Sequence, residues 1–247
     1  MSLERIVVFG ATSAIAQAVA RRFAARGARL HLVGRNGAKL EAVRADLVAR
    51  GAAGVTVAIA DLDDIALHRG LVDAAEAALG TVDAALIAQG KLPDQDACEA
   101  DFELTAAAWR TNFIAPASIA AQLANRFAAR GAGTIAVISS VAGDRGRKTN
   151  YVYGTAKGAL TVFLQGLRGR LHDKGVAVVT VKPGFVDTPM NTHLRKGVLW
   201  ASADRVAAGI VGAMERGTPE VYLPGFWWGV MFILRHLPER IFVRLNI

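Results

Sequence analysis

The chain has 247 residues, of which 53% are hydrophobic, so it can bury one large core, and we expect a single domain. Its one cysteine, Cys98, excludes an internal disulfide framework, and the apolar run at residues 6–9 begins too close to Met1 for a signal peptide, so we expect a cytoplasmic protein. The net charge of +8 comes from scattered basic residues without interleaved aromatic residues, which argues against a nucleic-acid partner. An anionic small molecule or an anionic membrane surface would be compatible with this positive charge.

Short apolar runs alternate with helical patterns along the chain. The runs that predict strands are residues 6–9, 30–33, 55–60, 84–88, 134–138 and 176–181. Between them, Leu40, Val43 and Leu47 recur at helical spacing, and the Ala-rich stretch 105–129 looks helical. This repetition predicts an α/β fold with a doubly wound parallel sheet of the Rossmann type. We expect one domain over residues 1–223 and an apolar, basic tail over residues 224–247.

The first predicted strand ends in a loop at residues 10–16, with the sequence Gly-Ala-Thr-Ser-Ala-Ile-Ala, and a helical stretch at residues 17–26 follows. A dinucleotide pyrophosphate binds at such a strand-turn-helix, where backbone N–H groups point at the phosphates. A glycine-rich fingerprint has three glycines, but here Ala14 and Ala16 stand beside Gly10, and each added methyl narrows the approach of the backbone to phosphate. A plain strand-to-helix turn stays the alternative.

The second predicted strand is followed by Gly34, Arg35 and Asn36, with no acidic residue to accept hydrogen bonds from a ribose 2′-hydroxyl. An arginine at this place favours a 2′-phosphate, so we predict NADP(H) rather than NAD(H); a solvated loop charge is the alternative. Asp61, at the end of the third strand, is placed to hydrogen-bond the adenine amino group or to cap a helix at residues 63–79.

Ser140, Tyr153 and Lys157 form the pattern with the clearest chemical meaning. A tyrosine has a free pKa of about 10, so it needs a nearby cation to shuttle protons at neutral pH. A lysine four residues later on a helix lies on the same face and would ease that ionisation. Ser140 follows a predicted buried strand, where its hydroxyl can meet a substrate oxygen. Tyr151 and Ser139 are the neighbouring residues that we expect to have ordinary packing roles.

The C-terminal stretch at residues 221–234 has no charged residue and is rich in aromatic side chains. The residues that define it are Phe226, Trp227, Trp228, Met231 and Phe232, followed by Arg235, Arg240 and Arg244. It is shorter than the roughly 20 apolar residues of a membrane-spanning helix. Two interpretations stay open: an amphipathic element in the membrane interface, or an apolar tail buried between subunits.

These motifs together resemble the classical short-chain dehydrogenase/reductases over residues 4–223. Ser140, Tyr153 and Lys157 fall on the catalytic residues of that family, and Asn112 falls on the asparagine that anchors its proton-relay water. The Pro-Gly segment at residues 183–188 resembles the one that holds the nicotinamide carboxamide. The resemblance implies cofactor contacts from Gly10, Thr12, Ser13, Ile15, Arg35, Asn36, Asp61, Leu62, Gln89, Gly90, Tyr153, Lys157, Pro183, Gly184, Val186 and Thr188.

The implied reaction is reversible hydride transfer between nicotinamide and a carbonyl carbon. In reduction, Tyr153 would protonate the forming alkoxide, Ser140 would hydrogen-bond the same oxygen, and Lys157 would lower the pKa of the tyrosine and hold the nicotinamide ribose. Asn112 would complete the proton path to solvent. The Asn-Asn-Ala-Gly of the family appears here as Ile-Ala-Gln-Gly at residues 87–90, which keeps its backbone contacts. The histidines are isolated, so we expect no metal.

The substrate side is less defined by the sequence. In the family, the loop at residues 187–201 covers the substrate, which makes Met190, His193, Leu194 and Trp200 candidate pocket residues, although an exposed loop position fits His193 as well. The charged segment at residues 144–148 offers Arg145 or Arg147 to a substrate phosphate, with a solvated loop as the alternative.

Variants at residues 10–16, 88–95 and 144–147 resemble a subgroup that includes the reductase half of decaprenylphosphoryl-ribose 2-epimerase, which implies a keto-sugar on a lipid carrier. A generic ketone or 3-oxoacyl substrate stays open. So does another class of protein, a nucleotide-sensing or membrane-docked binding protein without turnover. We expect a homo-oligomer, with peripheral membrane contact through the tail as a further possibility.

Overall fold

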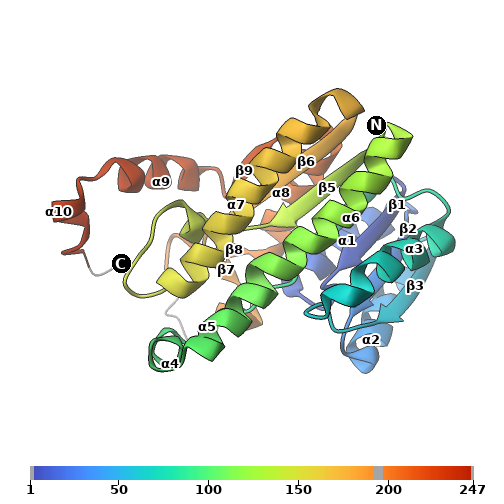
Figure 1. Ribbon diagram of the computed structural model, residues 1–247. Coiled ribbons are helices and arrows are strands. Elements are labelled where there is room, and N and C mark those ends of the chain that lie inside the picture. The colour runs from blue at the N-terminus through green and yellow to red at the C-terminus, as the bar shows by residue number, and fades with distance from the viewer. Residues whose placement is uncertain (1–2, 192–196, 246–247) are drawn as a thin grey trace.

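The computed structural model describes residues 3–191 and 197–245, which form one α/β unit around a central parallel sheet (Figure 1). The sheet order is β3-β2-β1-β4-β5-β6-β9. Its strands are β1 (Arg5–Phe9), β2 (Arg29–Gly34), β3 (Gly54–Ile59), β4 (Ala84–Ile87), β5 (Gly133–Ile138), β6 (Val176–Pro183) and β9 (Glu220–Leu223). The six predicted strands are confirmed within one or two residues, and the strand order reverses between β1 and β4, where open α/β sheets bind their ligands.

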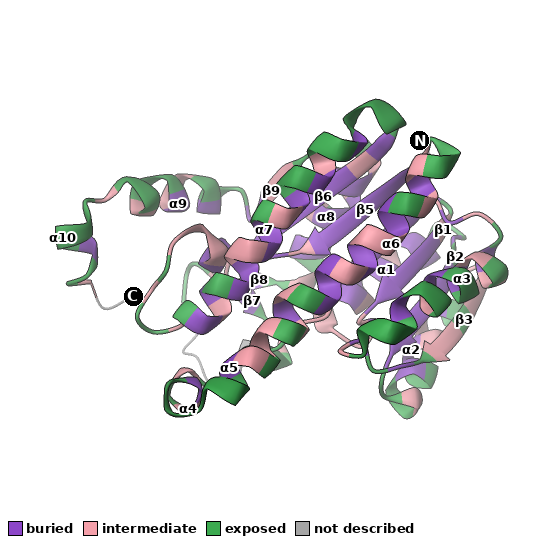
Figure 2. Cartoon of the chain, in the orientation of Figure 1, coloured by how far each residue is buried: buried purple, intermediate pink, exposed green. Residues whose placement is uncertain are grey.

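Helices cover both faces of the sheet, so successive residues of β1 alternate between two cores (Figure 2). Ile6 and Val8 pack with α1, α2 and α8, whereas Val7 and Phe9 pack with α3, α6 and α7. Burial on both faces explains why these strands read as continuous apolar runs. The helices are α1 (Ala14–Ala24), α2 (Gly37–Ala49), α3 (His68–Leu79), α6 (Ala115–Arg130), α7 (Tyr151–Leu171) and α8 (Ala203–Arg216).

Most of the shorter elements lie near the carboxyl ends of the strands, whereas η4 joins α7 to the amino end of β6. The helix predicted over residues 105–129 is not continuous, because a π-helical turn joins two α-helices. The short elements are η1 (Ile65–Leu67), α4 (Gln95–Ala100), α5 (Phe102–Trp109), the π-helical η2 (Arg110–Ile114), η3 (Val141–Asp144), η4 (His172–Lys174), β7 (Val186–Asp187), η5 (Pro189–Asn191) and β8 (Ala201–Ser202).

The C-terminal stretch divides into a strand and two helices. Val221 belongs to β9, which pairs with β6 at the edge of the sheet, so the uncharged stretch at residues 221–234 begins inside the sheet and leaves it after Leu223. The sequence did not predict β9, because a strand of four residues that starts with Glu220 and leads into an aromatic segment shows no clear alternation of polar and apolar residues. A cis Leu223–Pro224 bond leads to α9 (Phe226–His236) and α10 (Glu239–Phe242), which project from the body (Figure 1). Within residues 3–191 and 197–245, no helix has the length and hydropathy needed to cross a bilayer.

Glycines allow η3 to pack directly on α7. A Cβ on Gly143 would lie 2.6 Å from the Gly158 nitrogen, and a Cβ on Gly158 would lie 2.9 Å from the Gly143 oxygen. Gly154 is equally close to the backbone oxygen of Ala142. Backbone therefore meets backbone at this contact, and a side chain on either surface would push the turn away from the helix.

We predict that Gly158→Ala lowers the free energy of unfolding by about 1–3 kcal/mol, because its methyl group would lie 2.9 Å from the Gly143 backbone oxygen and would force the backbone to shift. Gly166→Ala is the matched control, since Gly166 lies in the same helix and a Cβ there would meet no packed neighbour within 4 Å. That control should gain about 0.5–1 kcal/mol from helix propensity. Urea unfolding measures both, and equal effects would contradict the packing constraint.

Candidate active site

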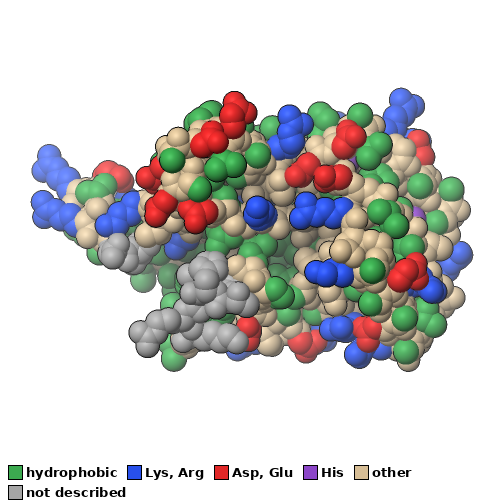
Figure 3. Space-filling model, turned by 90° about the horizontal axis from the view of Figure 1, so that it is seen from below, with side chains coloured by type: hydrophobic (Ala, Val, Ile, Leu, Met, Phe, Trp, Pro, Cys, Tyr) green, Lys and Arg blue, Asp and Glu red, His purple; other side chains and the backbone are tan. Residues whose placement is uncertain are grey.

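A cavity of about 760 Å³ opens at the carboxyl ends of the parallel strands. Its walls include Gly10 after β1, Arg35 after β2, Ala88 after β4 and Ser140 after β5. Figure 3 shows this end of the molecule, where the recess near the middle has hydrophobic side chains on its floor.

The cavity brings together residues that are far apart in the sequence. All four predicted catalytic residues line it. So do the predicted cofactor residues Gly10, Thr12, Ser13, Ile15, Arg35, Asp61, Leu62, Gln89, Gly90, Tyr153, Lys157, Pro183, Gly184, Val186 and Thr188. Asn36 is the exception, because its side chain accepts a hydrogen bond from the Lys39 nitrogen (2.9 Å) and caps α2 outside the lining.

The loop between β1 and α1 is shaped by one glycine and one cap. Gly10 has a φ of 77°, and a Cβ there would lie 2.6 Å from the Gln89 nitrogen, so only glycine fits this close approach. The Ser13 hydroxyl accepts from the Ala16 nitrogen (3.1 Å) and starts α1 at Ala14. Ala16 is buried in the core, whereas Ala14 lines the cavity, so the alanine that narrows the phosphate approach is Ala14.

Arg35 and Asp61 stand at the part of the cavity beyond β2 and β3. Arg35 is exposed and has no ion pair with any of the described residues. Asp61 accepts from the Asp63 nitrogen (3.1 Å), but it is not a helix cap, because Asp64 caps η1 by accepting from Ala66 (3.0 Å) and α3 starts only at His68. Both side chains are therefore placed to contact a ligand.

Tyr153, Ser140 and Lys157 meet at the opposite part of the cavity. The Lys157 ammonium lies 5.7 Å from the centroid of the Tyr153 ring and donates to the Ile138 carbonyl (2.9 Å). Burial raises the pKa of Tyr153 to about 12, and a hydrogen bond with Ser140 acts in the other direction. Burial also lowers the pKa of Lys157 to about 8. The expected easing of tyrosine ionisation by lysine is therefore outweighed by burial, and Tyr153 carries its proton at pH 7.

Asn112 lies in the π-helical turn η2 and is fully buried. Its amide nitrogen donates to the carbonyls of Lys91 (2.8 Å) and Ala108 (2.9 Å), and its oxygen accepts from the Lys91 nitrogen (3.0 Å). The side chain thus fixes the loop after β4 that carries Gln89 and Gly90. Such single π-helical turns are frequent at functional sites because they reorient one side chain within a helix.

The two neighbouring residues of the catalytic pattern occupy other places. Ser139 is buried and donates to the Lys157 carbonyl (3.0 Å), and its hydroxyl also bonds that of Thr161 (2.8 Å), so it joins β5 to α7. Tyr151 is 44% exposed and lines a separate hollow beside Arg147 and Phe242. Tyr151 is therefore not among the residues that line the cavity of Tyr153.

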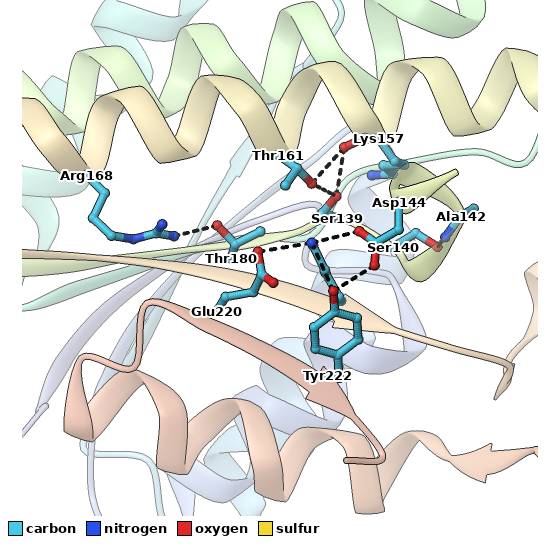
Figure 4. A network of polar contacts seen from close by, with 11 residues as sticks. Ser139, Ser140, Ala142, Asp144, Lys157, Thr161, Arg168, Thr180, Glu220 and Tyr222 are labelled. Atoms are coloured by element: carbon cyan, nitrogen blue, oxygen red, sulfur yellow. Dashed lines mark hydrogen bonds and ion pairs between the residues drawn. The ribbon is translucent and has the colours of Figure 1, made fainter. Parts of the chain in front are cut away.

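A buried ionic network holds the turn that carries Ser140, and the sequence did not predict it (Figure 4). The Lys182 ammonium lies 2.7 Å from Asp144 and 3.0 Å from Glu220, and the Lys182 and Asp144 side chains are each only 3% exposed. The Tyr222 hydroxyl donates to Asp144 (2.7 Å); burial and this bond raise the pKa of Tyr222. A lysine within an apolar strand, directly before Pro183, was the available signal.

Arg145, one of the two arginines considered for a substrate phosphate, binds the C-terminal helices instead. Arg145 donates to the carbonyls of Leu234 (2.5 Å) and Leu237 (2.7 Å) and pairs with Glu239 (2.8 Å), so that prediction is wrong for Arg145. Arg147 is half-buried in the separate hollow, and burial lowers its pKa.

Of the residues expected to contact substrate, the structure describes Met190 and Trp200. Met190 lines the cavity, whereas Trp200 stacks on Phe185 with ring centroids 5.6 Å apart. His193 and Leu194 lie outside the described residues.

Comparison with known proteins shows which family the chain is similar to. The family described as short chain dehydrogenase matches residues 4–198. The chain is 37% identical over 240 residues to an uncharacterised oxidoreductase of Mycobacterium tuberculosis, covering 97% of this chain and 96% of the relative. It is 36% identical over 241 residues to an uncharacterised oxidoreductase of Streptomyces coelicolor, covering 97% of this chain and 95% of that one.

A solved structure shares the fold. Actinorhodin polyketide ketoreductase, determined with NADPH, superposes with a TM-score of 0.79 at 22% identity, covering 90% of this chain and 97% of the other. The matched residues, the relatives and the parallel sheet agree, and the chain belongs to the short-chain dehydrogenase/reductase family of oxidoreductases.

Proposed function

We propose that the protein is an NADP(H)-dependent oxidoreductase that transfers hydride reversibly between a nicotinamide and a carbonyl or secondary alcohol. The observation that carries this proposal is the meeting of Ser140, Tyr153 and Lys157 at one end of a cavity whose other end holds Arg35 and Asp61. A dinucleotide is the ligand that would reach from one set of residues to the other.

The cavity residues fit such a ligand. Gly10 leaves an open backbone approach where any Cβ would collide with the neighbouring strand end, and Ser13 starts a helix whose first N–H groups face the cavity. The side-chain oxygen of Gln89 is buried without a hydrogen-bond partner among the described residues, which suits a donor on a bound ligand. When bound, a nicotinamide coenzyme supplies the hydride.

The side chains of this site donate the proton to the substrate oxygen and stabilise the negative charge that develops in the reaction. Tyr153, with its raised pKa, holds a proton at neutral pH and is the donor to an alkoxide formed in reduction. Ser140 is hydrogen-bonded to Tyr153, so its hydroxyl is placed to bond the same substrate oxygen. Lys157 is positively charged at pH 7 and stabilises the tyrosinate left after proton transfer.

Three observations support NADP(H) over NAD(H). The end of β2 has no acidic side chain, and Arg35 lines the cavity with its charge unpaired within the described part of the chain. An arginine in this position offers paired donors to a 2′-phosphate. The actinorhodin ketoreductase, similar in fold, was determined with NADPH.

We also propose a keto-sugar on a lipid carrier as the substrate, with a generic ketone or 3-oxoacyl compound as the alternative. The motif variants of the subgroup described above support the first, and the fold shared with a polyketide ketoreductase supports the second. A binding protein without turnover is the third possibility. Consumption of NADPH with a panel of ketones, 3-oxoacyl thioesters and keto-sugars tests all three, and coenzyme binding without turnover on any panel member would favour the binding protein.

Tyr153→Phe should reduce the turnover number by about 10²–10⁴-fold, because it removes the proton donor. Coenzyme affinity should be almost unchanged, since the ring remains in place. Tyr151→Phe is the control and should have a much smaller effect, because that side chain lies in the separate hollow. Single-turnover kinetics measure the chemical step directly, and greater damage from Tyr151→Phe would refute the assignment.

NADPH should bind more tightly than NADH, and Arg35→Ala should reduce the difference by about 1.5–3 kcal/mol, the usual worth of a hydrogen bond to a charged group. NADH is the internal control, because it lacks the phosphate that the arginine would contact. Fluorescence titration of both coenzymes with both proteins measures the difference. Equal affinities in the unmodified protein would exclude this role for Arg35.

Coenzyme affinity should fall as the pH rises through about 8, where the free protein's Lys157 loses its charge. A coenzyme that prefers the charged lysine raises the pKa of Lys157 when it binds. Above pH 8, binding must therefore take up a proton, so coenzyme affinity falls by up to about tenfold per pH unit. Lys157→Met should bind weakly and lose this inflection. Titrations from pH 6.5 to 9.5 test it, and an unchanged inflection in the variant would assign it to another group.

A further inference from the structure

Helix α9 has two apolar faces, of which the protein covers one. Trp227 and Met231 are buried against Val141 and Tyr222, and Val230 and Leu234 pack beside them. The opposite face exposes Phe226, Trp228, Phe232 and Ile233, each between 44% and 63% accessible. A surface helix of a water-soluble protein has polar residues on the side away from its core, so this outer face lacks its usual composition.

Further exposed apolar side chains follow α9 in the sequence. Ile241 and Val243, in and after α10, are also more than half exposed. Six of the eighteen exposed large hydrophobic side chains among the described residues therefore lie between residues 226 and 243. The rings of Trp228 and Phe232 stack at 5.5 Å, so these two side chains form one exposed aromatic patch. We call the exposed apolar side chains between Phe226 and Val243 the tail face.

The tail face is held in place on the body of the protein. Arg145 binds the carbonyls at the end of α9 and pairs with Glu239, and its guanidinium lies 3.7 Å from the centre of the Phe242 ring. At the other end of α9, Trp227 packs on Phe185, beside the Pro-Gly segment of the cavity. Along α9, Figure 2 shows both buried and exposed positions, which agrees with a helix that packs on the body with one side and leaves Trp228 and Phe232 exposed.

The charges around the tail face are almost all positive. Arg235, Arg240 and Arg244 are exposed, and none has an ion pair within residues 3–191 and 197–245. The single acidic residue of this region, Glu239, is already paired with Arg145. Figure 3 shows Lys and Arg side chains on the projecting end at its left, and the whole chain has a net charge of +8. The partner of this surface should be apolar and anionic.

We propose that the tail face docks on the surface of an anionic lipid bilayer, with its aromatic side chains in the headgroup region and its arginines on the lipid phosphates. α9 has 11 residues and is too short to span a bilayer, so it lies in the interface. A second copy of the chain fits less well, because a two-fold contact through this face would bring both sets of unpaired arginines together. The proposal does not depend on the reaction at the cavity.

Vesicle flotation of the full-length protein tests the proposal, with vesicles of phosphatidylcholine alone or mixed with phosphatidylglycerol. Truncation is unsuitable, since β9 belongs to the sheet and α9 packs beside the cavity. We expect binding to the mixed vesicles and a fall of about tenfold or more for both Trp228→Ala/Phe232→Ala and Arg240→Glu/Arg244→Glu. The matched controls, Phe102→Ala/Ile65→Ala and Arg69→Glu/Lys174→Glu, change exposed residues elsewhere and should bind as the unmodified protein does.

Tryptophan fluorescence identifies the contact. A blue shift on vesicle binding should be largely lost in Trp228→Phe, which keeps an aromatic side chain and should still float. Three results would overturn the proposal: no binding to mixed vesicles, equal binding to both vesicle types, or unchanged binding by the tail-face variants. A shift from oligomer to monomer in Trp228→Ala/Phe232→Ala, measured by sedimentation without lipid and combined with absent flotation, would assign the tail face to a second copy instead.

Discussion

The site depends on the position of one short turn, η3, which follows β5 and begins directly after Ser140. Two independent contacts fix it. On one side, the glycines at 143, 154 and 158 bring its backbone against α7, the helix that carries Tyr153 and Lys157. On the other side, Asp144 is locked to Lys182 in a buried ion pair, and breaking such a pair by removing one partner typically costs about 3–5 kcal/mol. The reacting groups are therefore held together by backbone packing and by charge.

The same turn connects the cavity to the C-terminal helices. Asp144 accepts from Tyr222 in β9, the next residue, Arg145, binds the end of α9, and Val141 packs with Trp227 and Met231. Through these contacts the tail face is anchored next to the part of the cavity that holds Ser140. Docking of that face on a bilayer would bring the cavity close to the lipid surface, where a carbonyl on a lipid carrier would be found. The docking proposal and the substrate proposal thus support each other but fail separately.

The sequence was sufficient where local pattern and chemistry agree. Strands buried on both faces appear as apolar runs, and the site residues predicted directly after these runs do line the cavity. It was insufficient where long-range contacts decide. The partners of Lys182 and Arg145 lie 38 to 94 residues away in sequence, and only the fold brings them together. In the sequence, neither residue can therefore be distinguished from an ordinary surface charge. The raised pKa of Tyr153 likewise comes from burial, which a helix spacing cannot show.

In the proposed reaction, this cavity passes a hydride from a nicotinamide to a carbonyl carbon, and the protein supplies the proton. The most direct measurement uses NADPH labelled with deuterium at nicotinamide C4, followed by mass spectrometry of the alcohol formed from the best substrate of the panel. The account predicts that one C4 face of the nicotinamide delivers its deuterium to the carbinol carbon. An alcohol without deuterium from either labelled face, or NADPH oxidation with no alcohol formed, would contradict it.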